Sequence, residues 1–237
     1  MQSFWEDEIS EGYYDKIFKD GFNSRKGIQP AWHFITFEKV GEFIKAKDSH
    51  LDYACGPGTF INFYGNRNSV GVDLAIKQIN YANKTYGNKN IFKTLDEFDY
   101  QQYENKFNVI TVLGLIEFID QDEFLKLIKN LKSMLCPGGK IIFTTPNFSI
   151  GMNILNLFID RFGQHSYTNH YTQKYTIAKL RNFLIENDLK EFSIKKFLNF
   201  GVFFAIFNIK IAKKIEFIFE KIFFGFFGFL LILVIKK

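Results

Sequence analysis

Short apolar runs and longer amphipathic segments alternate along most of this 237-residue chain. Over the first 45 or so residues, apolar side chains recur at three and four positions in YYDKIF and WHFITFEKVGEFI, which predicts helices. The runs SHLDYA, NIFKT, KFNVITVLGLI and GKIIFTTPN have the length and apolar character of strands. Strands that alternate with helices predict a parallel α/β sheet with right-handed crossovers.

Two of the intervening helices are well marked at their ends. IKQINYANKTYG predicts a helix that follows Asp73 and ends near Gly87. DQDEFLKLIKNLKSML begins with acids and places its large apolar side chains on one face, so it predicts a capped amphipathic helix. CPGG is expected to end that helix, because proline and glycine cannot continue it.

Polar residues and glycines collect where the predicted strands end. In a parallel sheet, ligands bind beside the carboxyl ends of the strands, which here are residues 52–58, 73, 113–117 and 144–147. Within LDYACGPGTF, Gly56 and Gly58 lie between a strand and a helix, where glycine lets the backbone approach a ligand closely. The sequence therefore predicts a cofactor site around this glycine turn.

Two classes of cofactor compete for the glycine turn, a dinucleotide and S-adenosylmethionine. The dinucleotide fingerprint GxGxxG is a poor match, because the third glycine position after Gly56 and Gly58 is Ile61. Asp73 does not discriminate, since it can accept hydrogen bonds from two ribose hydroxyls of either cofactor. Asp52 does discriminate, because an acid there repels a pyrophosphate and suits a ligand that carries an ammonium and a sulfonium.

Four ordered motifs resemble those of the class I S-adenosylmethionine-dependent methyltransferases. LDYACGPGTF resembles their first motif, VGVDLA the acidic motif that holds the ribose, FNVITVLGLIEFI the fourth-strand motif and LCPGGKIIFTTPN the fifth-strand motif. The resemblance implies an α/β, Rossmann-like doubly wound fold whose seven-stranded sheet is mostly parallel with an antiparallel last strand. We expect one domain over residues 1–237, with an N-terminal helical cap (1–47), a cofactor-binding core (48–147) and acceptor-side elements (148–237) that include a helical insertion before the last strand.

The resemblance also implies which residues hold S-adenosylmethionine. Asp52 and the backbone of residues 54–58 would face the methionine part, while Asp73 would hold the ribose hydroxyls. Leu113 and Gly114 would lie under the sulfonium. The full set implied for the cofactor is Asp52, Ala54, Cys55, Gly56, Gly58, Asp73, Leu74, Asp96, Leu113 and Gly114, with Leu74 beside the adenine and Asp96 near its amine. The alternative for Asp52 and Asp73 is that they are ordinary turn or capping acids.

The chain departs from the family pattern at two informative positions. Ala54 stands where a glycine is common, which is tolerable if its φ is negative. Glu117 is followed by Phe118, where many relatives carry Glu-His. A histidine that helps catalysis in some relatives is therefore missing here.

Candidate acceptor-side residues lie in QHSYTNHYT, residues 164–172. Methyl transfer from a sulfonium is an in-line displacement that depends on aligning the nucleophile with the methyl group in a dry site, and a hydroxyl acceptor also needs a base. His165 and His170 are the candidate catalytic bases, and Tyr167 and Tyr171 are candidate substrate contacts. The alternative for His170 and Tyr171 is a structural role at the start of the next helix.

The N-terminal helices add Tyr14 and His33 as candidate substrate contacts, since such helices can close over the cofactor in the family that the chain resembles. The resemblance favours a small-molecule acceptor, methylated on an oxygen of a sugar, a quinone or a lipid-linked substrate. Two alternatives remain, a nucleotide-dependent oxidoreductase and a non-catalytic, membrane-associated protein that binds the cofactor.

The apolar C-terminal region has competing interpretations. IFFGFFGFLLILVI, residues 222–235, has fourteen residues, fewer than the roughly 20 that a membrane span needs. FGFLLILVIKK has the β-branched character of a strand buried on both faces, so we predict the last strand there rather than an anchor. Within residues 205–224, one apolar stripe comprises Phe207, Ile211, Ile215, Ile218 and Ile222. This stripe is core, a cover over the acceptor pocket or a peripheral contact with anionic membrane.

The distribution of charge and the cysteine content limit the expected partners and the expected cellular compartment. Residues 174–237 carry twelve Lys/Arg against five Asp/Glu, a net +7 within a chain of net +5. A basic surface suits anionic lipid or nucleic acid, and without a recognised nucleic-acid motif we expect no nucleic-acid partner. Cys55 and Cys136 lie in different motifs without metal-like spacing, so neither a disulfide framework nor a metal site is indicated. With an acidic N-terminus that lacks an apolar run, we expect a cytoplasmic protein.

Overall fold

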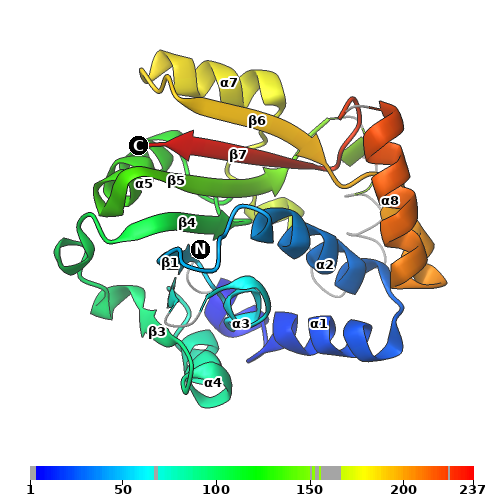
Figure 1. The fold of residues 1–237 in the computed structure, drawn as a ribbon, viewed down its shortest axis with the longest axis horizontal. Coiled ribbons are helices and arrows are strands. Elements are labelled where there is room, and N and C mark those ends of the chain that lie inside the picture. The colour runs from blue at the N-terminus through cyan, green and yellow to red at the C-terminus, as the bar shows by residue number, and fades with distance from the viewer. Residues whose placement is uncertain (1–3, 67–68, 150, 153–154, 156–166, 224) are drawn as a thin grey trace.

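A seven-stranded sheet forms the centre of the computed structural model, which describes residues 4–66, 69–149, 151–152, 155, 167–223 and 225–237 (Figure 1). The strands are β1 (His50–Tyr53), β2 (Val70–Asp73), β3 (Ile91–Thr94), β4 (Phe107–Leu113), β5 (Leu135–Pro146), β6 (Phe192–Phe197) and β7 (Leu230–Lys236). Their order is β3-β2-β1-β4-β5-β7-β6. Strands β1 to β5 pair in parallel, and β7 is antiparallel to both of its neighbours. The predicted Rossmann-like sheet with an antiparallel last strand is confirmed.

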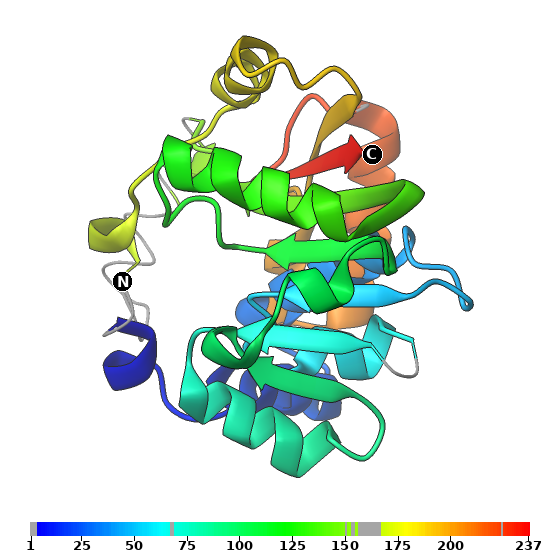
Figure 2. The same cartoon turned by 90° about the vertical axis from the view of Figure 1, so that its left-hand side faces the viewer.

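Helices cover both faces of the sheet. The α-helices are α1 (Tyr13–Ser24), α2 (Ile28–Gly41), α3 (Thr59–Tyr64), α4 (Ile76–Tyr86), α5 (Gln121–Met134), α7 (Ile177–Glu186) and α8 (Ile209–Phe223). The short helical turns are η1 (Phe4–Glu8), η2 (Leu95–Glu97), η3 (Gln101–Tyr103), η4 (Thr168–His170) and η5 (Phe200–Ile206). One core cluster joins α5 and α7 to the sheet, and a second joins α2, η5 and α8 to it (Figures 1 and 2). The helical pair η5 and α8 forms the predicted insertion between β6 and β7.

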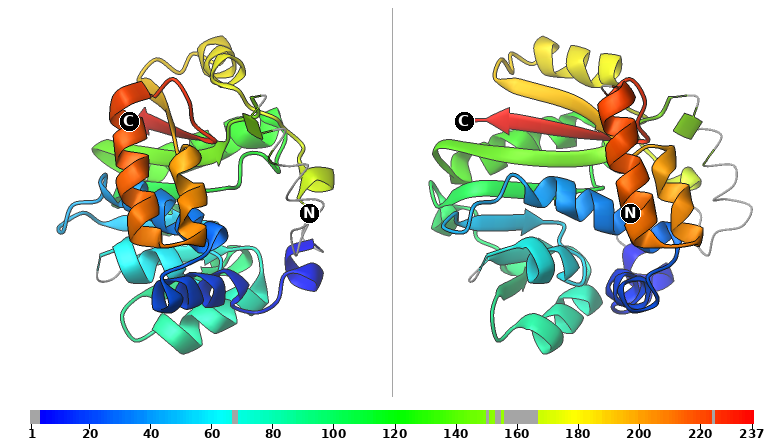
Figure 3. Two further views of the ribbon diagram at one scale, coloured as in Figure 1. Left: turned by 90° about the vertical axis from the view of Figure 1, so that its right-hand side faces the viewer. Right: turned by 45° about the vertical axis from the view of Figure 1, so that its right-hand side comes forward.

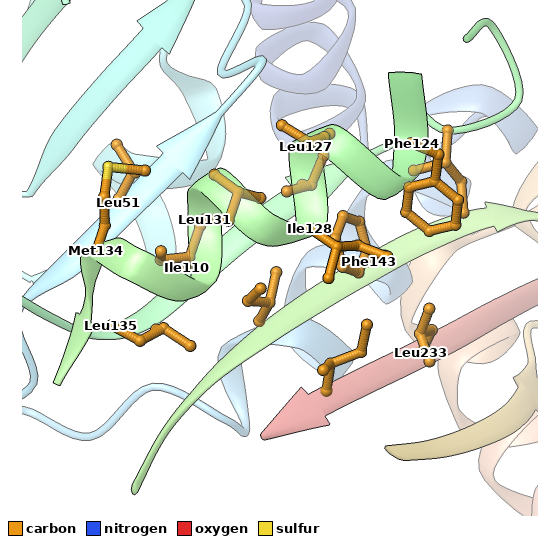
Figure 4. Close-up of a cluster of buried hydrophobic side chains, with 14 of the residues drawn as sticks. Leu51, Ile110, Phe124, Leu127, Ile128, Leu131, Met134, Leu135, Phe143 and Leu233 are labelled. Carbon is orange, nitrogen blue, oxygen red and sulfur yellow. The ribbon is translucent and has the colours of Figure 1, made fainter. Parts of the chain in front are cut away.

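Helix α5 shows how the sequence pattern produces the core. Its N-cap residue Asp120 accepts a hydrogen bond from the Glu123 backbone N–H at 2.8 Å, and the Glu123 carboxylate accepts one from the Asp120 N–H in return. The apolar side chains of α5 point onto β1, β4 and β5, where they are almost completely buried (Figure 4). The capped amphipathic helix predicted here is confirmed.

Helix α5 ends just before CPGG, as predicted, but the strand that follows begins earlier than the predicted segment GKIIFTTPN. Strand β5 already begins at Leu135, which pairs with Phe107 of β4. The register then shifts before Val109 pairs with Lys140. Gly138 has a φ of 73°, a left-handed conformation that glycine adopts without strain. The two glycines therefore permit an irregular strand start instead of a separate loop.

A buried carboxylate fastens the N-terminal helices to the region of the glycine turn. Asp15 of α1 is fully buried, and its Oδ1 accepts hydrogen bonds from Thr59 Oγ1 at 2.9 Å and Tyr86 Oη at 2.7 Å. Its Oδ2 accepts one from Tyr81 Oη at 2.7 Å and lies 2.8 Å from the ammonium of Lys19. Since Thr59 opens α3 directly after Gly58, this cluster ties α1 to the end of the turn.

Candidate active site

A cavity of about 1340 Å³ lies at the carboxyl ends of the parallel strands. One part of its wall is formed by residues 52–57 and 72–75, and another by residues 113–115, 117–119 and 144–146. The N-terminal helices, the segment around Met152 and the insertion residues Phe200 and Phe203 complete the wall. The elements predicted for cofactor and acceptor therefore share one cavity.

The glycine turn has the open geometry that close approach of a ligand requires. Gly56 and Gly58 have φ values of 52° and 77°, in the left-handed region. A Cβ at Gly56 would meet nothing within 4 Å, so the backbone there faces free space. A Cβ at Gly58 would lie 2.6 Å from the ring of Phe92, so packing excludes a side chain at that position.

Ala54 does not have the negative φ that would accommodate an alanine without strain. Its φ is 62°, not negative, so an L-residue occupies the left-handed region between β1 and the glycine turn. This conformation costs a non-glycine residue about 1–2 kcal/mol. The turn thus holds local strain at a residue that lines the cavity.

Replacing Ala54 with glycine is expected to raise the free energy of unfolding by roughly 0.5–1 kcal/mol, because relief of the strain exceeds the entropy that glycine loses on folding. Ala82 is the matched control, since it lies within α4 and has an ordinary helical backbone. Ala82→Gly should lower stability by about 1 kcal/mol. Chemical denaturation of both variants checks the difference, and a destabilised Ala54→Gly protein would contradict the strain.

Two acids line the part of the cavity next to the turn, the buried Asp52 and the partly buried Asp73. Asp52 is 2% exposed and accepts a hydrogen bond from Thr111 Oγ1 at 2.6 Å, yet burial raises its pKa to about 7. Asp73 accepts hydrogen bonds from the Gly56 and Ala75 backbone N–H groups at 2.7 and 2.8 Å, and burial raises its pKa as well. Within the described residues neither acid has an ion-pair partner. A cationic ligand would stabilise both carboxylates, so this wall fits a sulfonium and an ammonium.

The structure brings most of the predicted cofactor residues to this cavity. The lining includes Asp52, Ala54, Cys55, Gly56, Asp73, Leu74, Leu113 and Gly114. Gly58 closes the turn behind them. Asp96 lies on η2 with an exposed side chain, and the neighbouring Leu95, rather than Asp96, is in the cavity wall.

Four predicted substrate contacts also line the cavity: Tyr14, His33, Tyr167 and Tyr171. The hydroxyls of Tyr14 and Tyr167 lie 2.8 Å apart, which joins α1 to the segment after β5. Burial raises the pKa of Tyr14, so this hydroxyl stays protonated. Burial lowers the pKa of His33 to about 4, so its imidazole is neutral at pH 7 and can accept a hydrogen bond.

The candidate base His170 is placed less favourably. His170 is not among the residues that line the cavity, and its ring packs 4.1 Å from the ring of Phe4. Figure 2 shows η1 and η4 close together at the same end of the molecule. His165 lies outside the described residues. The contacts described for His170 are therefore those of a packed side chain.

Glu117, at the carboxyl end of β4, is a cavity-lining residue that the sequence interpretation did not select. Its side chain is 3% exposed, and Oε2 has no hydrogen-bond partner among the described residues. Burial raises its pKa to about 7, while the nearby Thr145 opposes the shift. The signal was present in the sequence, because an acid directly after a buried strand lies at the ligand-binding edge of the sheet.

Comparison with known proteins places the chain in a family. A family model described as a methyltransferase domain matches residues 31–191. An uncharacterized protein of Rickettsia prowazekii is 31% identical over 159 residues, which are 63% of each chain. A ubiquinone biosynthesis O-methyltransferase of Coxiella burnetii is 26% identical over 144 residues, 56% of this chain and 60% of the relative. The chain thus spans less than two thirds of the length of these relatives.

Solved structures share the fold at low identity. A SAM-dependent methyltransferase of Thermotoga maritima superposes with a TM-score of 0.60 at 12% identity, over 97% of this chain and 98% of that one. The family match supports methyl transfer over the dinucleotide oxidoreductase. The chain belongs to the methyltransferase-domain family, and its resemblance to the class I S-adenosylmethionine-dependent methyltransferases is confirmed.

Proposed function

We propose that this methyltransferase moves a methyl group from S-adenosylmethionine to an oxygen of a small-molecule acceptor, in the class of sugars, quinones and lipid-linked compounds. The observation that carries the proposal is a single cavity in which a cation-compatible wall adjoins an aromatic wall with hydroxyls and a buried carboxyl. The name of the Coxiella burnetii relative, an O-methyltransferase, supports an oxygen acceptor. The aromatic wall favours an acceptor with a substantial apolar part.

When bound, S-adenosylmethionine supplies an electrophilic methyl group on a sulfonium. Asp52 and the open backbone at Gly56 would hold its amino acid part, and Asp73 would accept hydrogen bonds from the ribose hydroxyls. Each Asp73 oxygen already accepts one backbone N–H, so the remaining lone pairs are available to the ribose. The same hydrogen bonds keep the glycine turn in position.

Glu117 is the residue that we propose as proton acceptor. The acceptor oxygen would take the methyl group that the bound cofactor supplies, with the neutral thioether as leaving group, and the Glu117 carboxylate would take up the hydroxyl proton. A base with a pKa near the working pH is well suited to this role, and burial gives Glu117 a pKa of about 7. The neutral His33 imidazole and the Tyr14 hydroxyl would orient the acceptor.

Replacing Asp73 with alanine is expected to weaken binding of S-adenosylhomocysteine by on the order of 2 kcal/mol, since charge-assisted hydrogen bonds to the ribose are lost. Asp96→Ala is the matched control, because Asp96 is exposed and is not among the residues that line the cavity. Calorimetric titration measures both affinities. Equal losses in the two variants, or no loss in a folded Asp73→Ala protein, would remove the ribose assignment.

Methyl-labelled S-adenosylmethionine, incubated with the protein and an extract of host cells, tests the proposed reaction. Label that moves into small molecules supports a small-molecule acceptor, and resistance of the label to mild hydrolysis of esters excludes a carboxylate oxygen as the methylated atom. Label found only in protein or nucleic acid would overturn the choice of acceptor. Binding of S-adenosylmethionine without any transfer would favour the non-catalytic, cofactor-binding alternative.

A further inference from the structure

The insertion between β6 and β7 carries a large exposed apolar surface. Among the described residues from η5 through α8 to the turn at residues 226–227, seven large apolar side chains are more than half exposed: Phe200 52%, Ile206 59%, Phe207 69%, Phe217 58%, Ile218 51%, Ile222 59% and Phe226 71%. We call this surface the insertion face. Helices η5 and α8 lie side by side on the outside of the molecule (Figure 3). A contiguous apolar patch of this kind marks a site of contact with a partner or a membrane.

The insertion face corrects one interpretation of the sequence. The stripe that includes Phe207, Ile211 and Ile222 is exposed, so it is not core. The side of α8 that packs on the sheet instead carries Ile209 and Ala212. The helical period alone could not distinguish the two sides, because α8 has apolar residues on both.

The positively and negatively charged residues of α8 have different surroundings. Lys210, Lys214 and Lys221 are exposed beside the apolar residues. Of the two acids of α8, Glu216 is buried and accepts hydrogen bonds from Asn199, whereas Glu220 is 42% exposed and pairs with Lys39 of α2 at 2.7 Å. The outer side of α8 therefore combines apolar side chains with lysines, and the partly exposed carboxylate of Glu220 is paired with Lys39.

We propose that the insertion face docks onto an anionic lipid bilayer. A helix with exposed aromatic and aliphatic residues, flanked by lysines, is suited to lie in the interface of a membrane, with its apolar side chains among the acyl chains and its ammonium groups at anionic headgroups. No helix in the described part of the chain is long and apolar enough to cross a membrane. Docking is thus peripheral, and charge complementarity selects the lipid.

The cavity wall continues into the insertion face. Phe200 lines the cavity, is 52% exposed, and has its ring 6.5 Å from that of Phe227 in the turn. Phe203 and Phe229 extend the same aromatic wall inward. This step rests on the proposed function: a docked protein would receive an acceptor that is dissolved in the bilayer through this wall.

Sedimentation with vesicles tests docking without reference to catalysis. Binding is measured to vesicles of phosphatidylcholine with about 30% phosphatidylglycerol and to vesicles of phosphatidylcholine alone. The double variant Lys210→Gln, Lys214→Gln should bind the anionic vesicles roughly 30-fold more weakly at low salt, at about one fivefold step for each lysine. Lys126→Gln, Lys129→Gln on α5 makes the same charge change at exposed positions and should bind like the wild type.

A second matched pair of variants tests the apolar part of the insertion face. Ile222 and Ile185 are each 59% exposed and lie near the ends of α8 and α7. Ile222→Ser should weaken vesicle binding roughly tenfold, and Ile185→Ser should leave it unchanged. Absence of vesicle binding by the wild type, or equal losses in each matched pair, would overturn the proposal. So would a wild-type dimer that Ile222→Ser dissociates, because the face would then bind a second copy of the chain.

Cofactor affinity separates this inference from the proposed function. The variants of the insertion face should bind S-adenosylhomocysteine as the wild type does, since none of the three altered residues lines the cavity. If vesicle binding is confirmed but no acceptor is methylated, the docking proposal stands and the proposed reaction fails. If acceptors are methylated equally well with and without vesicle binding, delivery through the bilayer is overturned.

Discussion

Replacing Glu117 with glutamine is expected to lower the turnover of methyl transfer to a hydroxyl acceptor by about 100-fold, at the low end of what a general base contributes. Glutamine keeps the shape of the side chain but cannot accept the proton. Because Glu117 is buried with one oxygen unpartnered among the described residues, the amide also avoids burying a charge, so the variant should remain folded. Turnover is measured at saturating cofactor and acceptor, with S-adenosylhomocysteine affinity as the control for binding.

The pH dependence of turnover tests the role of Glu117 as a base more directly than the turnover at one pH does. A base acts in its ionised form, and the pKa of Glu117 is raised from 4.5 to about 7 by burial. Wild-type turnover should therefore fall about tenfold per pH unit below pH 7 and level off above it. Glu117→Gln should lose this dependence, whereas Asp52→Asn, in the cofactor wall, should change cofactor affinity and keep the profile. An unchanged profile in Glu117→Gln would contradict the role of Glu117.

Replacing Asp15 with alanine is expected to lower the free energy of unfolding by about 3 kcal/mol, because three hydroxyl groups lose their common acceptor. The hydroxyls belong to Thr59, Tyr81 and Tyr86, which come from α3 and α4. The Lys19 ammonium is 39% exposed and contributes little, because water screens it. Thermal and chemical denaturation measure the change.

Variants that each delete one tyrosine hydroxyl provide the comparison for Asp15→Ala. Tyr81→Phe and Tyr86→Phe each remove one hydrogen bond to Asp15 and should cost about 1 kcal/mol. Since Thr59 follows the glycine turn, Asp15→Ala should also weaken S-adenosylhomocysteine binding, and the tyrosine variants should do so less. If Asp15→Ala lowers the free energy of unfolding no more than Tyr81→Phe does, the carboxylate is not the centre of the cluster.

Local pattern was sufficient for five of the seven strands and for the glycine turn beside the cavity, whereas β2 and β6 were implied only through the family resemblance. Strand β4 is a continuous apolar run, α5 has a capped amphipathic pattern, and each effect acts within a few residues. The glycine turn was equally visible, since Gly56 and Gly58 adopt the positive φ values for which glycine is suited. The ends of the strands then located the cavity, because parallel strands bring their carboxyl ends to one edge.

Other features depend on contacts between distant residues, which no local pattern encodes. Asp15 receives its hydrogen bonds from residues 44 to 71 positions away, so its importance was not visible in YYDKIF. The outward side of α8 depends on which side packs on the sheet. His170 looked chemically suited to act as a base, yet its ring packs against the ring of Phe4 in a tilted arrangement. The position of Phe4 depends on the path of the N-terminal segment.

The position of β7 has a consequence for the order in which the chain can fold. Strand β7 pairs with β5 on one side and β6 on the other, although it follows both in the sequence. During synthesis, the edge of β5 stays open and β6 has no neighbour until β7 has left the ribosome. Unpaired edges of this kind are sites of aggregation, so the nascent chain should need protection over the interval in which the insertion is translated.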